Sequence, residues 1–393
     1  MAAKSISELD LQGRRIFIRL DLDVPITPAG GVSDPERIRA CLPTIKHAID
    51  RGGRVVLATQ LGQPKGLPRA ELTLLPIAAY LAESLGRDLV LADEPAGDGA
   101  KKVVHDLRDG SVAMLENLGF TPAERGNDET LARMLASYAD VYVNDAFSSF
   151  SKAMSSTVGM VKHVTAKGIG FQVEKELKFL SKLSGEVEKP FVVVLGGTKL
   201  KEKFGLLESL LGRATTICFG GVLANTFLRA RGANLGGSLV EESKLPQARA
   251  FLTKAEAAGV RIVLPKDLVV ATDLNGSEGV TVRANQVPDA MAAFDLGPET
   301  VAEFAQVLSK AHTVLWNGPL GAAENNRFSE ATYTLAKSLA NLLGVNIAVG
   351  NDTVNAIHRS GTAANFTHLS AGSTAALEYI EGKKLPGLTA LES

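Results

Sequence analysis

The stretch FVVVLGGTKLKEK, residues 191–203, decides how the chain is interpreted. Its first five residues are apolar and three of them are valine, which predicts a buried strand. Two glycines and the start of a basic helix follow, an arrangement that suits a phosphate. Lys199 and Lys203 would share one face of that helix. Because a G-x-x-x-x-G-K-[ST] loop is absent, an ordinary strand-turn-helix with solvated lysines stays open as an alternative.

Length and composition fit a globular protein with more than one domain. The 393 residues suit two or three domains, and 45% hydrophobic and 22% charged residues allow a large buried core. The net charge of −1 and the lack of Lys/Arg runs argue against a nucleic-acid partner.

Cysteine usage and hydropathy favour a reducing compartment. Cys41 and Cys218 are far apart and flank apolar patterns, which predicts buried thiols. Residues 1–15 have no apolar segment of signal-peptide length, and no apolar run has the length that a membrane span needs. We therefore expect a cytoplasmic protein, monomeric and without a membrane partner.

Strand-like and helix-like segments alternate along the whole chain. The predicted strands lie at 15–20, 54–58, 88–91, 111–115, 140–143, 191–195, 216–219, 261–264, 313–316 and 346–349. Helices are predicted from Asp34 onward and at 74–85, 128–138, 246–258, 298–310, 329–343 and 352–358. Such alternation predicts a parallel sheet covered on both faces. The expected fold class is α/β, with two doubly wound parallel-sheet domains joined by a helical hinge.

The mixed-charge segment 174–180 is the expected hinge helix, although an ordinary surface helix fits the same pattern. Ligands of open α/β sheets bind at the carboxyl ends of the strands. Polar or glycine-rich segments follow the predicted strands at 20–25, 59–64, 115–120, 144–147, 196–197, 220–221, 316–319 and 350–353. Asp352 begins a helical stretch, where it would hold a metal ion beside a phosphate or serve simply as an N-cap.

In order along the chain, these motifs resemble the phosphoglycerate kinase family over nearly the full length. The matching motifs include DLDVP at 21–25, DVYVNDAF at 140–147, GGTK at 196–199, WNGP at 316–319 and DTV at 352–354. The resemblance implies reversible phosphoryl transfer between ATP and 3-phosphoglycerate, with Mg²⁺ as cofactor and ATP or ADP as substrate. It also implies an acidic-substrate domain over 1–170, onto which 378–393 pack back, and a nucleotide-binding domain over 171–377.

The nucleotide half of the family pattern is retained. The resemblance implies that Lys199 and Lys203 are catalytic and neutralise the transferring phosphoryl group and the nucleotide phosphates. Asp352 would bind Mg²⁺, Thr353 would hold phosphate oxygens, and Glu324 would take the ribose hydroxyls. Further implied nucleotide residues are Gly196, Gly197, Gly220, Gly221, Asn317 and Gly350. Phosphoryl transfer needs mainly positioning and charge compensation, which these residue types supply.

The substrate half departs from the family pattern. Where the family has S-H-L-G-R-P, L-E-N-[LV]-R-F and A-F-G-T-A-H-R-A-H, this chain has TQLGQP at 59–64, Gly119 in place of arginine, and AFSSFSKAM at 146–154. Of the basic residues that the family would use, Arg37 remains, Lys152 replaces an arginine, and two arginines and two histidines are absent. The implied substrate-binding residues are Asp21, Asp23, Arg37, Gln60, Gln63, Gly119 and Lys152, with Arg37 also catalytic.

Loss of two arginine contacts would weaken the binding of an anionic substrate by about 3–6 kcal/mol, or about 10²–10⁴ in affinity. Asp23, where the family has asparagine, adds a negative charge. We expect weak or lost activity on 3-phosphoglycerate, and a working kinase with an unusual site stays open. Two further alternatives are a non-catalytic Mg-nucleotide-binding paralogue with a regulatory or binding role, and a kinase for a less anionic acceptor. For the latter, a polar pocket would be formed by Gln60, Gln63, Ser148, Ser149 and Ser151.

Three loops near the nucleotide also differ from the family. Its G-G-G-D is VGND at 349–352, and its S-T-G-G-G-A is SAGSTA at 370–375. A lost glycine crowds the backbone if its φ was positive, whereas Asn351 tolerates that conformation. The family's G-V-F-E is GAAE at 321–324, so we expect an aromatic wall of the pocket to be missing.

Overall fold

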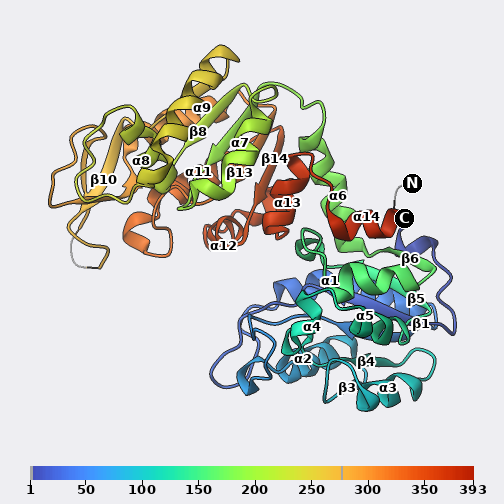
Figure 1. Cartoon of the computed structure of the whole chain (residues 1–393). Coiled ribbons are helices and arrows are strands. Elements are labelled where there is room, and N and C mark those ends of the chain that lie inside the picture. The colour runs from blue at the N-terminus through green and yellow to red at the C-terminus, as the bar shows by residue number, and fades with distance from the viewer. Residues whose placement is uncertain (1–2, 276–277) are drawn as a thin grey trace. The chain divides into compact units, whose positions relative to one another are not determined.

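The computed structural model describes residues 3–275 and 278–393, and the chain divides into two compact units (Figure 1). The first unit comprises the chain up to Lys178 together with Lys384–Ser393, and the second comprises Phe179–Lys383. These ends differ from the expected ranges 1–170, 171–377 and 378–393. The reason is that helix α6 (Phe171–Ser184) runs without a break across the boundary at residues 178 and 179, and α13 (Ser373–Ile380) packs on α7 (Phe204–Leu210) within the second unit.

The first unit is built on a six-stranded parallel sheet of order β3-β4-β2-β1-β5-β6. Its strands are β1 (Arg15–Leu20), β2 (Arg54–Ala58), β3 (Leu89–Leu91), β4 (Val112–Met114), β5 (Val141–Asp145) and β6 (Ala166–Ile169). Its helices are α1 (Glu36–Asp50), α2 (Leu75–Leu85), α3 (Asp98–His105), α4 (Pro122–Arg125), α5 (Glu129–Ala136) and α14 (Pro386–Glu392). The strand order runs outward from β1 and β5 in opposite directions, so the topological switch lies between these two strands.

The second unit repeats this plan with the order β15-β14-β13-β7-β8-β9, again all parallel. Its strands are β7 (Phe191–Leu195), β8 (Thr216–Phe219), β9 (Arg261–Val263), β13 (Thr313–Asn317), β14 (Val345–Val349) and β15 (His368–Ser370). Its remaining helices are α8 (Gly221–Ala230), α9 (Leu245–Ala257), α10 (Pro298–Leu308), α11 (Glu330–Ala340) and α12 (Asn351–Arg359). Here the switch lies between β7 and β13. The predicted fold class of two doubly wound parallel sheets is confirmed.

The second unit also holds a small antiparallel sheet that the sequence pattern did not predict. It has the order β11-β10-β12, formed by β10 (Asp267–Ala271), β11 (Val280–Arg283) and β12 (Ala292–Leu296). The edge strands β6 and β15 were also not predicted, because they are short and carry polar residues or glycine. The predicted helices at 74–85, 128–138, 246–258, 298–310 and 329–343 are confirmed to within a few residues.

Burial explains why the central strands were recognisable. Every side chain of β7 is essentially inaccessible to solvent, since helices cover both faces of the sheet. Each such Val, Leu or Phe stabilises the fold by about 1.5–3 kcal/mol relative to an exposed position. Cys41 and Cys218 are free and buried, as expected. Within the described ranges, we find no helix with the length and apolarity required to cross a membrane.

Helix α6 carries the chain from the first unit to the second, and both of its ends are capped. At its N-terminus Asp145, which is 1% exposed, accepts hydrogen bonds on Oδ1 from the amides of Gln172 (2.9 Å) and Val173 (3.0 Å). Burial raises the pKa of this carboxyl to about 6. Near the other end, Arg213 donates to the carbonyl of Leu183 (2.6 Å). The connecting helix is therefore fixed within each unit by a charge of the sign that suits its dipole.

Candidate functional site

Glycine loops meet at the switch between β7 and β13. The Gly196 amide donates to the carbonyl of Asn317 (3.0 Å), and the Gly197 amide donates to the carbonyl of Pro319 (2.8 Å). A Cβ atom at Gly196 would collide with the Pro319 carbonyl oxygen, and Gly318 has a φ of +96°. The two strand ends therefore approach each other so closely that glycine is required there.

Lys203 lies beneath these loops. Its side chain is 9% exposed, and its amine donates to the carbonyl oxygens of Gly196 (2.6 Å) and Asn317 (3.2 Å). Burial lowers the pKa of the amine to about 8, although the charges of Glu202 and Asp352 oppose this shift. The switch point thus contains a buried cation that is bonded to neutral carbonyls.

Lys199 is placed differently from our expectation. A 3₁₀ helix, Leu200–Lys203, precedes α7, so the chain after Gly197 does not enter an α-helix directly. The Lys199 side chain is 70% exposed and pairs with Glu202 at 3.2 Å, while Lys203 points inward. The expectation that the two lysines share one helix face is wrong, because the residues between them are not in a continuous α-helix.

The N-terminus of α12 faces the same switch point. Gly350 caps it with a φ of +98°, Asp352 lies exposed in its first turn, and buried Thr353 accepts a hydrogen bond on Oγ1 from the Gly318 amide (2.7 Å). Asn317 donates from Nδ2 to the Val349 carbonyl (2.8 Å), and its buried Oδ1 has no partner among the described residues. An unused acceptor, a carboxylate and a helix N-terminus therefore lie near the buried lysine.

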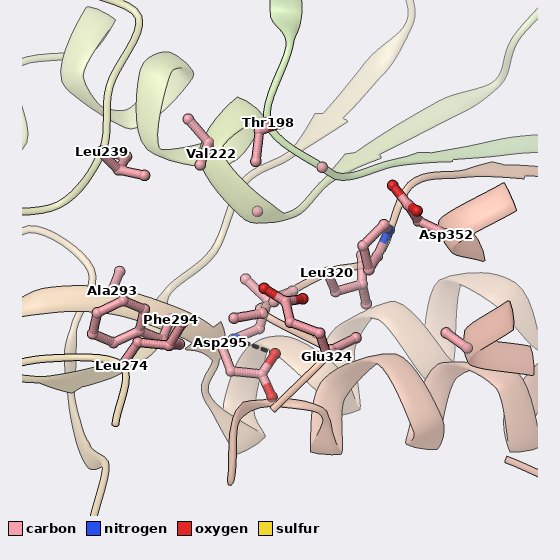
Figure 2. A pocket seen from close by; sticks show the side chains of 18 of the residues that line it. Thr198, Val222, Leu239, Leu274, Ala293, Phe294, Asp295, Leu320, Glu324 and Asp352 are labelled. Atoms are coloured by element: carbon pink, nitrogen blue, oxygen red, sulfur yellow. Dashed lines mark hydrogen bonds between the residues drawn. The ribbon is translucent and has the colours of Figure 1, made fainter. Parts of the chain in front are cut away.

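A cavity of about 570 Å³ opens beside these groups (Figure 2). Figure 2 shows Phe294 and Leu274 at one end of the view, Asp352 at the other and Glu324 between them. One end is therefore apolar and the other is polar, as is typical of sites for a ligand with an aromatic part and a charged part. Ala323 lines the cavity where the family motif has an aromatic residue, and Phe294, from β12 of the unpredicted antiparallel sheet, supplies a ring elsewhere in the lining.

The predicted nucleotide residues fall into three groups. Those that line the cavity are Gly197, Gly221, Glu324 and Asp352. Those that form the layer behind it are Gly196, Lys203, Gly220, Asn317, Gly350 and Thr353. Lys199 stands exposed on the loop after β7. Lining residues that sequence reasoning missed include Phe294, Asp295 and Arg359.

Among its described residues, the second unit offers Mg²⁺ few ligands of its own. No group of three or more His, Cys, Asp and Glu side chains lies together in the ranges 3–275 and 278–393. Mg²⁺ is commonly held by one or two carboxylates, water and substrate phosphates, without a dedicated protein cage. One of the carboxylates in the cavity lining, that of Asp352, fits an ion that arrives with a nucleotide.

In the first unit, the predicted substrate residues contact one another. Arg37 donates from Nη1 to Asp21 Oδ1 (3.0 Å), and Ser148 donates from its hydroxyl to Asp21 Oδ2 (2.6 Å). Asp23 accepts a hydrogen bond on Oδ1 from the Gly62 amide (2.9 Å). In the same loop, Gln60 donates from Nε2 to the Gly62 carbonyl (3.0 Å). The two carboxylates that follow β1 are therefore already hydrogen-bonded within the unit.

Gly119 lies in a 3₁₀ helix, Leu118–Phe120, against the loop that follows β2. Its amide donates to Asn117 Oδ1 (3.0 Å), and a Cβ atom at position 119 would lie 2.7 Å from Cγ of Pro64. The proline ring therefore occupies the space that any side chain at 119 would need. Gln63 and Lys152 are exposed on their loops and do not join the Asp21 cluster through a described hydrogen bond.

One of the altered glycine loops is strained. Ser373, in the segment where the family has three glycines, has a φ of +48°. Asn351, by contrast, is the first residue of α12 and has no positive φ. The expected crowding of the backbone therefore applies to Ser373 and not to Asn351.

The second unit has the features of a nucleotide-binding α/β domain. Glycine loops, a buried lysine and a helix N-terminus converge at the switch point of its parallel sheet, next to a cavity with an apolar end. A second parallel α/β unit in the same chain defines the class as two-domain α/β proteins.

Comparison with known proteins identifies the family within that class. The family model described as phosphoglycerate kinase matches residues 6–383. A phosphoglycerate kinase of Anaeromyxobacter dehalogenans (strain 2CP-C) is 47% identical over 395 residues, which cover 100% of both chains. The structure of phosphoglycerate kinase from Coxiella burnetii superposes with a TM-score of 0.88 at 33% identity, covering 99% of each chain. The crystal structure of the Pyrococcus horikoshii OT3 enzyme gives a TM-score of 0.83 at 27% identity, covering 99% of this chain and 98% of that one. The chain belongs to the phosphoglycerate kinase family.

Proposed function

We propose that this family member binds Mg-ATP or Mg-ADP in the cavity of the second unit and phosphorylates 3-phosphoglycerate weakly or not at all. The observation that carries the proposal is the pairing of Arg37 with Asp21 at 3.0 Å. Arg37 is the arginine that the family pattern leaves in this site, and its guanidinium is already bonded to a carboxylate. An incoming anion competes with Asp21 for it and also meets the charge of Asp23.

The nucleotide half of the proposal rests on the polar and charged groups around the cavity of the second unit. Lys203 would offset the charge of the phosphates, and Lys199, on its exposed loop, would contact the transferring phosphoryl group. Asp352 would hold Mg²⁺, and Thr353 with Gly350 would place the N-terminus of α12 toward phosphate oxygens. Glu324 would bind the ribose hydroxyls. The ion supplies further charge neutralisation when the nucleotide brings it.

We also propose that the protein acts in the cytoplasm as a monomer, without a nucleic-acid partner. A net charge of −1 supports the last point. Size-exclusion chromatography with light scattering at micromolar concentration measures the oligomeric state, and a dimer would contradict the proposal.

Two measurements on the full chain test the proposed activity. Mg-ADP should raise the melting temperature, and a coupled assay with ATP and 3-phosphoglycerate should give a turnover far below the roughly 1–10³ s⁻¹ of ordinary enzymes. Turnover in that range overturns the predicted loss of activity. No stabilisation by Mg-ADP overturns the nucleotide half. Stabilisation without turnover of 3-phosphoglycerate supports the proposal, and it identifies a non-catalytic nucleotide-binding paralogue if other acceptors are not phosphorylated either.

A second candidate function is a kinase for a less anionic acceptor. The hydrogen bond from the Ser148 hydroxyl to Asp21 (2.6 Å) favours it, because the hydroxyl of an acceptor would be able to take the place of Ser148. Glycerate and neutral polyols, assayed by ADP release, test this candidate. Release that exceeds the acceptor-free rate supports it, and equal rates with and without acceptor contradict it.

A further inference from the structure

Helix α12 forms one wall of the cavity along its whole length. Asp352, Asn355, Ala356 and Arg359 all line the cavity, and their spacing of three, four and seven residues places them on one helix face. Seven residues of α-helix rise about 10.5 Å. The wall therefore presents a carboxylate in its first turn and a guanidinium in its last.

Arg359 is bonded to the loop that carries Glu324. It donates from Nη1 to the Ala323 carbonyl (3.1 Å) and from Nη2 to Asn326 Oδ1 (2.9 Å). Its guanidinium also lies over the ring of Tyr333, 5.9 Å from the centroid. The two acceptors stand on either side of Glu324 in the chain. A planar fork that bonds on both sides of one residue fixes the orientation of the segment between them.

The same loop has a separate attachment on its other side. Asn325 donates from Nδ2 to the Leu274 carbonyl (2.7 Å), and Arg327 donates from Nη1 to the Asn275 carbonyl (3.0 Å). Loss of Arg359 would leave these two bonds intact. The loop would then remain attached to the protein but would lose its bonds to the last turn of α12.

We propose that Arg359 is a positioning residue that ties the Glu324 loop to α12 and so fixes the spacing between Glu324 and Asp352. That spacing sets how strongly the cavity selects a nucleotide with its ribose hydroxyls in place. The inference rests on the proposed function, since it assigns phosphate and ribose ends to the cavity. Figure 2 shows Glu324 and Asp352 at different places along the cavity, and Arg359 bonds the loop of Glu324 to the helix that carries Asp352.

Calorimetry of the full chain with Mg-ADP, Mg-2′-deoxy-ADP and Mg-3′-deoxy-ADP tests the inference. The wild-type protein should prefer ADP to one of the deoxy nucleotides by about 10–100-fold, as expected for hydrogen bonds to a carboxylate. Arg359→Ala should reduce this preference to about threefold or less while the affinity for the deoxy nucleotide stays nearly unchanged. Arg359→Lys retains the charge but not the fork, so it should give an intermediate preference.

Two controls separate positioning from a general structural effect. Arg249→Ala removes an arginine of the same unit that bonds the Ala230 carbonyl (3.1 Å) away from the cavity, and it should leave the preference unchanged. In a Glu324→Ala background, Arg359→Ala should cause no further loss of preference, because Arg359 acts through Glu324.

The outcomes are distinct. No binding of Mg-ADP by the wild-type protein overturns the proposed function and this inference with it. Binding with an unchanged ribose preference in both Arg359 variants overturns the inference alone. Equal weakening of ADP and deoxy nucleotides also overturns it, since that result indicates direct contact between Arg359 and the ligand. If Arg359→Ala fails to fold, the Arg359→Lys variant and its combination with Glu324→Ala decide the question.

Discussion

The two parallel sheets have the same plan, but their switch points differ in how far their charges are satisfied. At the switch of the first unit, Asp21 is bonded to Arg37 and Ser148. At the switch of the second unit, Lys203 is bonded to neutral carbonyls, and Asn317 Oδ1 has no partner in the described part of the chain.

Buried groups without a matching partner are unfavourable for the free protein and are retained where a ligand completes them. A site whose charges already pair with one another is not stabilised to a comparable extent when an anion binds. We propose that this difference prepares the second unit for a charged ligand, whereas the carboxylate of Asp21 in the first unit is already satisfied by Arg37 and Ser148. Five experiments test this contrast.

The largest effect is expected from substitutions that make the predicted substrate site of the first unit more basic. The triple variant Asp23→Asn, Gln63→Arg and Lys152→Arg should raise kcat/KM for 3-phosphoglycerate by about 10–10³-fold, because it removes one repulsive charge and adds bidentate donors. Asparagine at 23 still accepts the hydrogen bond from the Gly62 amide, so the loop should keep its conformation. Steady-state kinetics measure the gain, and an unchanged kcat/KM would show that these positions do not limit the activity.

Removal of the buried cation should strongly affect the second unit. Lys203→Ala should lower the affinity for Mg-ADP by about 10–10²-fold, as expected for the loss of hydrogen bonds to phosphate. Lys199→Ala is the matched control with a smaller effect, because the Lys199 amine is 70% exposed and screened by water. Calorimetry compares the two variants, and equal losses would contradict the distinction between them.

Refilling position 119 should destabilise the first unit. Gly119→Arg places a Cβ atom 2.7 Å from Pro64 Cγ, and such overpacking costs about 1–3 kcal/mol of unfolding free energy. Urea denaturation measures the loss, and the double variant Gly119→Arg, Pro64→Ala should recover part of it. If Gly119→Arg alone keeps wild-type stability, the loop has room that the structure does not show.

The pH dependence of nucleotide binding should report Lys203. Because the pKa of its amine is about 8, affinity for Mg-ADP should be constant below that pH and fall by about tenfold for each pH unit above it. Stability should respond in the opposite direction: the buried charge is unfavourable below pH 8, and this cost is relieved between pH 8 and the ordinary pKa of 10.5. Lys203→Arg should bind with a flat profile over this range, and a flat wild-type profile would contradict the assignment.

The smallest effect concerns the strained serine. Ser373→Gly should raise the unfolding free energy by about 0.5–1 kcal/mol. The left-handed conformation costs about 1–2 kcal/mol for a residue with a side chain, and glycine avoids that cost. Part of the gain is offset because glycine loses more backbone entropy on folding. Asn351→Gly is the matched control and should be slightly destabilising, because Asn351 lies in a helix. A lower melting temperature for Ser373→Gly would show that the serine side chain makes a favourable contact.

The sequence predicted those parts of the fold that depend on local pattern. Strands such as β1, β2 and β7 are apolar runs buried on both faces, and their limits were predicted correctly. The small antiparallel sheet was missed, because β11 has exposed residues and shows no continuous apolar run. Strand propensity and hydrophobic periodicity describe a residue and its sequence neighbours. This sheet depends instead on antiparallel pairing of β10 with β11 and β12.

For the candidate site, the glycines, Lys203 and Asp352 were predicted because they belong to motifs that follow strands. The orientation of Lys199 was wrong, since a 3₁₀ helix replaces the expected α-helix turn. Pairing of Arg37 with Asp21 was not predictable, because it depends on how α1 packs beside the end of β1. The missed Arg359 did leave a signal, namely its position seven residues after Asp352 on the same helix face.

The first unit is formed from two separate chain segments, and this affects when it can be completed during translation. Helix α14 belongs to that unit, where the Gly387 amide donates to the Phe150 carbonyl (3.0 Å) and Leu391 is buried. Residues 384–393 leave the ribosome only after the whole of the second unit, Phe179–Lys383, which is one continuous stretch. The unit that is translated first is therefore completed last. A second unit that has already folded replaces a long flexible loop and lowers the entropy lost when α14 returns to the first unit.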